Sequence, residues 1–303
     1  MSEIDSSFED QINLGADPKW LSVLKSLWRF VRTQPLGTAG ILVILTIAFL
    51  AIFADYVHTS DPEGFGRNFL APPSGENFFG TNRNGQDLWS RVVFGARPAL
   101  ILGLGAVGVA MFVATILALL AGFFGGVIDT LLSRLVEILI AVPQILWLLM
   151  LTTAFDRSIQ TLIFAIAFAF SPITLRVLRG NVIQEAAVPY VEAARVIGAS
   201  SPRIMLRHIL PNMAPLMIVI ASITIPAALL AEAGLTFLGL GLEPGTPSWA
   251  MDLGGGARQY FASGWWLPVF PGAALAITVL SFNLLGDSLR DVLDPRLRGS
   301  GLV

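Results

Sequence analysis

Few side chains in this 303-residue sequence have the types and spacing that chemistry requires. Three long apolar segments separate the two histidines, His58 and His208. If each segment crosses a membrane, the histidines lie on opposite sides, which excludes a metal site or a triad built on both. Cysteine is absent, so disulfides, thiolate metal sites and cysteine nucleophiles are excluded. No G-x-x-x-x-G-K-[ST] stretch occurs, so the chain has no loop of its own to hold ATP phosphates.

Glu137 and Glu232 are the ionisable residues closest to the apolar segments. Charged groups inside a membrane are rare and are functional by default, so both are candidate pathway or gating residues. Each also has a structural alternative. Glu137 can form an ion pair with Arg134 one helical turn earlier, and Glu232 lies near a segment end, where its carboxylate can reach the membrane surface.

The glycines at 103, 105 and 108 formally match the G-x-G-x-x-G dinucleotide fingerprint. That fingerprint needs a preceding strand and a following acidic residue, whereas here it lies inside a long charge-free run. Close packing of membrane helices through small residues explains it better. The small residues at Gly122 and Gly126 have the same meaning.

Composition places the chain in a membrane. Hydrophobic residues make up 54 % of it, charged residues only 13 %, and the mean hydropathy is +0.72; a soluble domain carries about 25 % charge. A helix needs about 20 residues to cross the hydrocarbon core, and lipid offers the backbone no hydrogen-bond partners. Six charge-free windows meet this length, which predicts an all-α integral membrane protein with six transmembrane helices: 33–54, 98–128, 138–155, 158–175, 209–231 and 259–286. The third and fourth windows are separated only by Asp156-Arg157, which predicts a tight helical hairpin.

The basic residues indicate the orientation of these spans. Of the 19 Lys and Arg, 13 fall on the side that holds both termini and six on the other. The positive-inside bias therefore places both termini, and the polar loop 176–208, in the cytoplasm. A net charge of −2 gives no reason to expect nucleic acid as a partner.

The resulting organisation starts with a span that is retained, because it is too long and its flank too acidic for a cleaved signal peptide. Asp87 is expected to cap a short interfacial helix before the second span, and Trp249, Trp265 and Trp266 to anchor the second outer loop at headgroup depth. The segments are a cytoplasmic N-terminal segment 1–35, a first transmembrane helix 36–56, an external loop 57–97, a five-helix core 98–298 that includes the cytoplasmic loop 176–208, and a tail 299–303.

The most informative polar segment runs from Tyr190 to Pro211, YVEAARVIGASSPRIMLRHILP. The residues before Gly198 can form about two helical turns, and Gly198 can adopt the left-handed conformation that ends a helix. Ser201 is expected as the N-cap of a second helix with Pro202 in its first position. The segment therefore predicts a short helix, a bend and a second helix that leads into the fifth span.

This segment resembles the cytoplasmic "EAA" loop of bacterial ABC importer permeases. The resemblance implies a coupling surface for a separate ATPase, on which Ala193 and Ala194 leave a flat face for close approach. It further implies the type I ABC importer permease fold. The residues that carry the coupling role by this resemblance are Glu192, Ala193, Ala194, Arg195, Gly198, Ser201, Pro202, Leu210 and Pro211.

Three further stretches are similar to the dipeptide/oligopeptide/nickel importer family and its C-type subunit: FGTNRNGQDLWSRVVFGARPAL at 79–100, LTFLGLG at 235–241, and NLLGDSLRDVLDPRLR at 283–298. Asn82 stands where that family usually has Asp, and Gln86 where Arg is common. The likeness implies peptides, nickel chelates or oligosaccharides as substrates. It implies as partners a homologous second permease, two ATPase subunits that bind ATP and Mg²⁺, and an external substrate-binding protein. This chain itself is expected to be non-catalytic, without cofactor or metal, and multi-pass in the bacterial inner membrane.

Two other classes of membrane protein are alternatives to this interpretation. A stand-alone secondary transporter or channel would show inverted repeats and coupling-ion residues in broken helices, and neither is evident. An intramembrane enzyme would need Ser/His or paired Asp side chains in mid-span, and none is so arranged.

Overall fold

The computed structural model describes residues 28–260 and 264–293 of the chain. Within them the regular structure is helical, apart from one isolated bridge between Thr81 and Asp87. Five helices are long and apolar enough to span a membrane, and a bent pair makes a sixth candidate: α3 (Pro35–Ile52), α5 (Leu88–Phe124), the pair α6 (Gly126–Ala141) and α7 (Gln144–Ala154), α8 (Ile159–Ala186), α11 (Leu210–Phe237) and α13 (Trp266–Leu293). The expected all-α membrane architecture is therefore confirmed.

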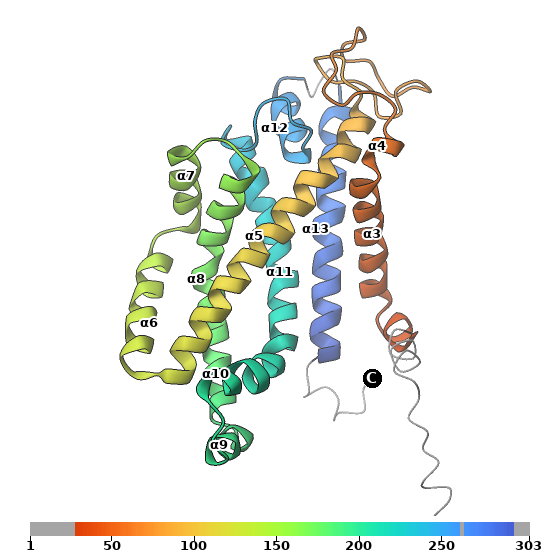
Figure 1. The fold of residues 1–303 in the computed structure, drawn as a ribbon. Helices are drawn as coiled ribbons and strands as arrows, with labels where there is room; N and C mark the ends of the chain where they lie inside the picture. The colour runs from red at the N-terminus through yellow and green to blue at the C-terminus, as the bar shows by residue number, and fades with distance from the viewer. Residues whose placement is uncertain (1–27, 261–263, 294–303) are drawn as a thin grey trace, which may run out of the picture.

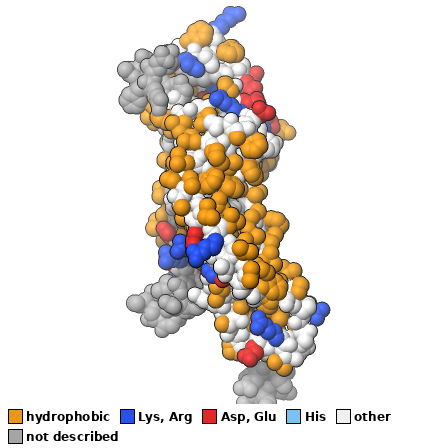
Figure 2. All heavy atoms as spheres, turned by 90° about the vertical axis from the view of Figure 1, so that its left-hand side faces the viewer, with side chains coloured by type: hydrophobic (Ala, Val, Ile, Leu, Met, Phe, Trp, Pro, Cys, Tyr) orange, Lys and Arg blue, Asp and Glu red, His pale blue; other side chains and the backbone are white. Residues whose placement is uncertain are grey.

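The spanning helices form a bundle in which α5 crosses diagonally (Figure 1). α5 packs most extensively on α8, and α3 lies along α13 (Figure 1). Hydrophobic side chains cover the middle of the face seen in Figure 2, and charged side chains gather nearer its two ends. This distribution fits a belt of lipid around the helices.

Small residues bring the helices close together. A Cβ atom on Gly103 would lie 3.2 Å from Leu229 of α11, and one on Gly105 would lie 3.1 Å from Ile163 of α8. The helix-packing interpretation of these two glycines is confirmed, whereas Gly108 faces open space. Gly126 does not pack either; it follows Gly125, and both have positive φ in the turn that ends α5.

The prediction of a separate interfacial helix before the second span is wrong. Asp87 is the N-cap, and its carboxylate accepts a 2.9 Å hydrogen bond from the Ser90 backbone N–H. The helix that begins there continues without a break to Phe124 and passes through Pro98. A proline removes one backbone bond, but neighbouring membrane helices let the helix continue.

The third span differs from its expected bounds. It begins at Gly126, well before 138, and breaks at Val142-Pro143, where α6 and α7 bend by 86°. Charged residues along α6 do not interrupt the helix, and they are paired. Arg134 donates to Glu137 at 2.7 Å, and the Arg179 Nη2 of α8 donates to Asp129 at 2.6 Å.

Short elements close the two ends of the bundle. α4 (Ala54–Val57) and α12 (Trp249–Tyr260) lie at the upper end with the two long loops, and α9 (Pro189–Val196) and α10 (Ser201–Ile204) at the lower end (Figure 1). The expected loop 176–208 is thus largely helical, since α8 extends to Ala186. Three stretches lie outside the described residues: 1–27, 261–263 and 294–303. They contain most of the N-terminal segment, the DPR ending and the tail 299–303.

Candidate functional site

The lower end of the bundle carries a short helix, α9, that projects beyond the spanning helices (Figure 1). Pro189 stands in its first turn, where a missing N–H costs nothing. Gly198 follows its end with φ +80°. The Gly198 N–H donates to the Arg195 carbonyl and the Ala199 N–H to the Ala194 carbonyl, each at 3.0 Å. These two bonds form a Schellman motif, so the predicted helix end at Gly198 is confirmed.

The two faces of α9 differ sharply. Val191 and Ala194 are buried against the bundle, whereas Glu192, Ala193 and Arg195 are exposed. The expectation that Ala194 offers a docking surface is wrong, because its methyl group packs inward one turn after Val191. Val196 and Ile197 are 81 % and 84 % exposed, and together with Ala193 they form an apolar tip.

Side-chain hydrogen bonds fix α9 to the spans on either side. The Tyr190 hydroxyl donates to Glu185 of α8 at 2.6 Å and accepts from Asn212 of α11 at 3.0 Å. Burial of the hydroxyl, followed by the hydrogen bond to Glu185, raises the pKa of Tyr190 above its ordinary value, so the phenol stays a donor. The Arg195 guanidinium lies 5.1 Å from the Phe123 ring centre, a cation–π contact with the end of α5.

A second short helix leads from α9 into α11. Ser200, not Ser201, is the N-cap, without a side-chain hydrogen bond, and Pro202 is in the first turn. α10 continues through a π-helical turn, η1 (Met205–Ile209), into α11 without a gap. Leu210 and Pro211 open α11, and Pro211 is exposed. The expected order of short helix, bend and second helix is therefore confirmed, and the structure brings the predicted coupling residues to one end of the molecule.

The two candidate pathway residues have different surroundings. Glu137 is exposed and ion-paired with Arg134, which matches the structural alternative. Glu232 is buried, and its carboxylate accepts a 2.9 Å hydrogen bond from the Thr236 hydroxyl. It is covered by protein, because α11 ends in a second Schellman motif at Gly239 and Gly241 comes back against Thr236. A Cβ atom on Gly241 would collide with the Thr236 hydroxyl at 1.9 Å, so the LTFLGLG motif covers Glu232.

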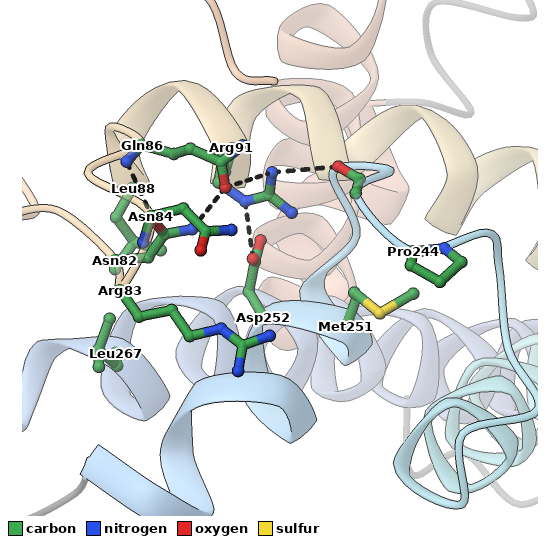
Figure 3. A pocket seen from close by; sticks show the side chains of 11 residues that line it. Asn82, Arg83, Asn84, Gln86, Leu88, Arg91, Pro244, Met251, Asp252 and Leu267 are labelled. Atoms are coloured by element: carbon green, nitrogen blue, oxygen red, sulfur yellow. Dashed lines mark hydrogen bonds and ion pairs between the residues drawn. The ribbon is translucent and has the colours of Figure 1, made fainter. Parts of the chain in front are cut away.

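At the upper end, a buried arginine joins the loop before α5 to the loop before α12, the two loops expected to be outer (Figure 3). Arg91 Nε donates to Asp252 of α12 at 2.7 Å, and the two side chains are only 3 % and 8 % exposed. Its Nη1 donates to the carbonyls of Pro62 at 2.9 Å and Gly245 at 3.2 Å. The guanidinium thus ties the start of α5 to the first loop and to the loop before α12. Burial raises the pKa of Asp252, and Arg91 acts in the opposite direction.

A cavity of about 120 Å³ lies beside this ion pair, and Asn82, Gln86 and Asp252 contribute to its wall (Figure 3). Asn82 Nδ2 donates to Gln86 Oε1 at 2.8 Å, so these two departures from the family pattern contact each other. Gln86 Nε2 also donates to the Glu63 carbonyl at 2.9 Å. The neutral amide pair connects two turns of the first outer loop.

Two of the three expected tryptophan anchors are interior residues. Trp249 and Trp266 are buried and donate their indole N–H to the carbonyls of Val92 at 2.7 Å and Thr81 at 3.1 Å. Only Trp265 of this group is largely exposed. The buried indoles hold the outer loops to each other, so the upper end is a cross-linked cap on the bundle.

No metal centre is formed by the residues that the structure describes, since no group of three or more His, Asp and Glu converges there. His58 and His208 lie at opposite ends, and His58 packs edge-on against Phe94 with 5.6 Å between ring centres.

The described chain is thus a bundle of candidate membrane-spanning helices, with a capped upper end and a short helix that projects at the lower end (Figure 1). Residues 114–299 match the family described as "Binding-protein-dependent transport system inner membrane component". The chain belongs to this family, and it is a permease of the ABC importer class.

Curated relatives cover nearly the whole chain. A di/tripeptide transport system permease protein of Pseudomonas aeruginosa is 38 % identical over 92 % of this chain and 94 % of its own length. A putative peptide transport system permease protein of Brucella suis is 38 % identical over 86 % and 88 %. A glutathione transport system permease protein of Pectobacterium atrosepticum is 35 % identical over 90 % and 91 %.

Proposed function

We propose that this permease forms half of the translocation pathway of an ATP-driven peptide importer in a bacterial inner membrane. Glutathione is itself a tripeptide, so the names of all three relatives described above favour peptides over nickel chelates and oligosaccharides. The observation that carries the coupling role is the exposed apolar tip of α9. An apolar surface that projects beyond the lipid-covered helices calls for a protein partner.

In this proposal the partner at α9 is an ATPase subunit that binds ATP and Mg²⁺. Ala193, Val196 and Ile197 enter its surface groove, with Glu192 and Arg195 at the rim. Ala194 acts from the inner side, by packing α9 on the bundle. Closure of the two ATPases moves α9, and the motion passes through Tyr190 to α8 and α11. The spans then tilt, and the central cavity opens alternately to the two sides.

The remaining partners follow from the same proposal. A homologous permease completes the pathway, and an external binding protein docks on the outer loops 57–97 and 240–267. The termini and α9 face the cytoplasm, as the 13-to-6 distribution of basic residues supports. Because the chain has no cysteine, a Ser200→Cys variant reports this orientation directly. We expect an impermeant thiol reagent to label it only after the cells are opened. Labelling in intact cells would contradict the orientation.

The experiment that tests the function is uptake of a labelled dipeptide by cells that lack their own peptide importers. The chain is expressed with its second permease, ATPases and binding protein, and each component is omitted in turn. We expect uptake only with the full set, and ATPase chains that co-purify with the permease. Uptake by the permease alone would support the stand-alone transporter or channel instead. Uptake of a nickel chelate or an oligosaccharide without peptide uptake would reassign the substrate.

A further inference from the structure

The third span borders a cavity, called the wedge here, which is lined by residues of α6 and α8. α6 leaves α5 at the Gly125-Gly126 turn, packs chiefly on α5 and α8, and bends away at Pro143. The wedge has two chambers. One of about 470 Å³ is lined by Ser133, Arg176 and Arg179 as well as apolar residues. Figure 2 views the molecule from the side of this third span.

The second chamber is apolar and measures about 260 Å³. Its wall is formed by aliphatic and aromatic side chains of α5, α6 and α8, among them Val113, Leu139 and Phe168. Val136 and Leu175 line both chambers, so the two adjoin. A polar chamber next to a dry one fits an amphiphile better than it fits a small polar solute.

The polar chamber has a surplus of positive charge. Arg179 is ion-paired with Asp129, and Glu137, which also lines the chamber, is paired with Arg134. Among the described residues no carboxylate pairs with Arg176, which is exposed to the chamber. The Ser133 hydroxyl is buried there and has no hydrogen-bond partner within the described part of the chain. A free guanidinium and a free hydroxyl together suit a phosphate group.

We propose that this cavity binds one anionic phospholipid from the leaflet on the α9 side. Its phosphate contacts Arg176 and Ser133, and one acyl chain fills the chamber behind Val136. Basic pockets between membrane helices hold anionic headgroups in this way. The site does not depend on which solute the permease carries.

Native mass spectrometry of the delipidated full-length permease tests this proposal, with phosphatidylglycerol and phosphatidylcholine as probes. Both lipids carry the phosphate, but the choline of phosphatidylcholine adds a cation that the surplus positive charge of the chamber repels. We therefore expect phosphatidylglycerol to bind at least about tenfold more tightly. Arg176→Gln should lower the affinity for phosphatidylglycerol by about tenfold and that for phosphatidylcholine by less, because the choline is then repelled less. Arg203→Gln removes an exposed arginine of α10 outside the cavity and should have no effect.

Two further measurements guard against misfolding and other ligands. Val113→Phe narrows the apolar chamber from a half-exposed position and should weaken binding of both lipids while Arg176 stays intact. Equal binding of the two lipids, or an equal loss in Arg203→Gln, would overturn the proposal. So would inorganic phosphate that competes at the same concentration as phosphatidylglycerol, because the site would then take a free anion. Displacement of phosphatidylglycerol by a dipeptide would assign the cavity to the transport pathway instead. Loss of peptide import without loss of lipid binding would count only against the proposed function.

Discussion

The left-handed glycine at the end of α9 allows the sharpest test of coupling. In Gly198→Val a β-branched residue has to adopt φ near +80°. No atom lies within 4 Å of the added Cβ, so the variant suffers backbone strain and no collision. Left-handed backbone costs an L-residue about 1–2 kcal/mol. Relaxing that strain breaks the two 3.0 Å hydrogen bonds of the Schellman motif, at about 1 kcal/mol each.

Either route costs about 1–2 kcal/mol, which lowers the ratio of correctly oriented to displaced α9 by about 5- to 30-fold. We therefore expect dipeptide uptake to fall, by up to about tenfold, and the ATPases to co-purify poorly. Membrane insertion and expression should be normal, because the apolar spans determine insertion. Glu192→Ala should be milder, since it removes one exposed polar group and keeps the helix.

Two variants serve as controls for this experiment. Gly198→Asn should transport nearly as well as the wild type, because Asn tolerates the left-handed region. Gly180→Val introduces the same side chain into α8, where there is also open space but no positive φ, and should be close to neutral. If Gly198→Val transported at the wild-type rate with its ATPases bound, the coupling role of α9 would be refuted.

The remaining predictions concern the outer cap and the energy source. Asp252→Asn leaves Arg91 buried without its carboxylate, which should lower the free energy of unfolding by about 3 kcal/mol and lower the thermal unfolding temperature in detergent. As a control, Asp55→Asn breaks an exposed pair and should leave that temperature nearly unchanged. Gln86→Arg alone places a second cation beside Arg91 and should destabilise the cap. Adding Asn82→Asp should recover about 0.5–3 kcal/mol of the free energy of unfolding, through an ion pair between the two new side chains. An equal loss of stability in the single and double variants would contradict this. The purified permease without ATPases should bind no ATP in equilibrium dialysis, and stoichiometric binding would refute our reading of its sequence.

Local sequence signals predicted α9 and its C-terminal end well. The position of α9 follows from Pro189 and Gly198, residues that act within a few positions of themselves. The inward direction of Ala194 also had a signal, since Val191 and Ala194 lie three residues apart on one helix face. The boundary of the next helix shifted from Ser201 to Ser200, because either serine suits an N-cap.

Charge-free windows predicted six spans, where the described residues form five spanning helices and a bent pair as a sixth candidate, and they did not predict where each span starts. The windows end at every charge, whereas α6 continues through charges that pair with one another or with α8. The Arg91–Asp252 pair joins residues 161 positions apart. No local pattern connects such distant residues, and the buried roles of Trp249 and Trp266 were missed for the same reason.

The unbroken length of α5 has a mechanical consequence. Its 37 residues extend about 55 Å at 1.5 Å per residue, well beyond the roughly 30 Å of hydrocarbon that it crosses. One end is held by Arg91 in the outer cap, and the other lies under Arg195 of α9. α5 therefore connects the upper cap to α9 through one continuous helix. A tilt of about 10° displaces its two ends by about 10 Å relative to each other for this length, so a tilt that starts at α9 reaches the upper cap as a displacement of that size.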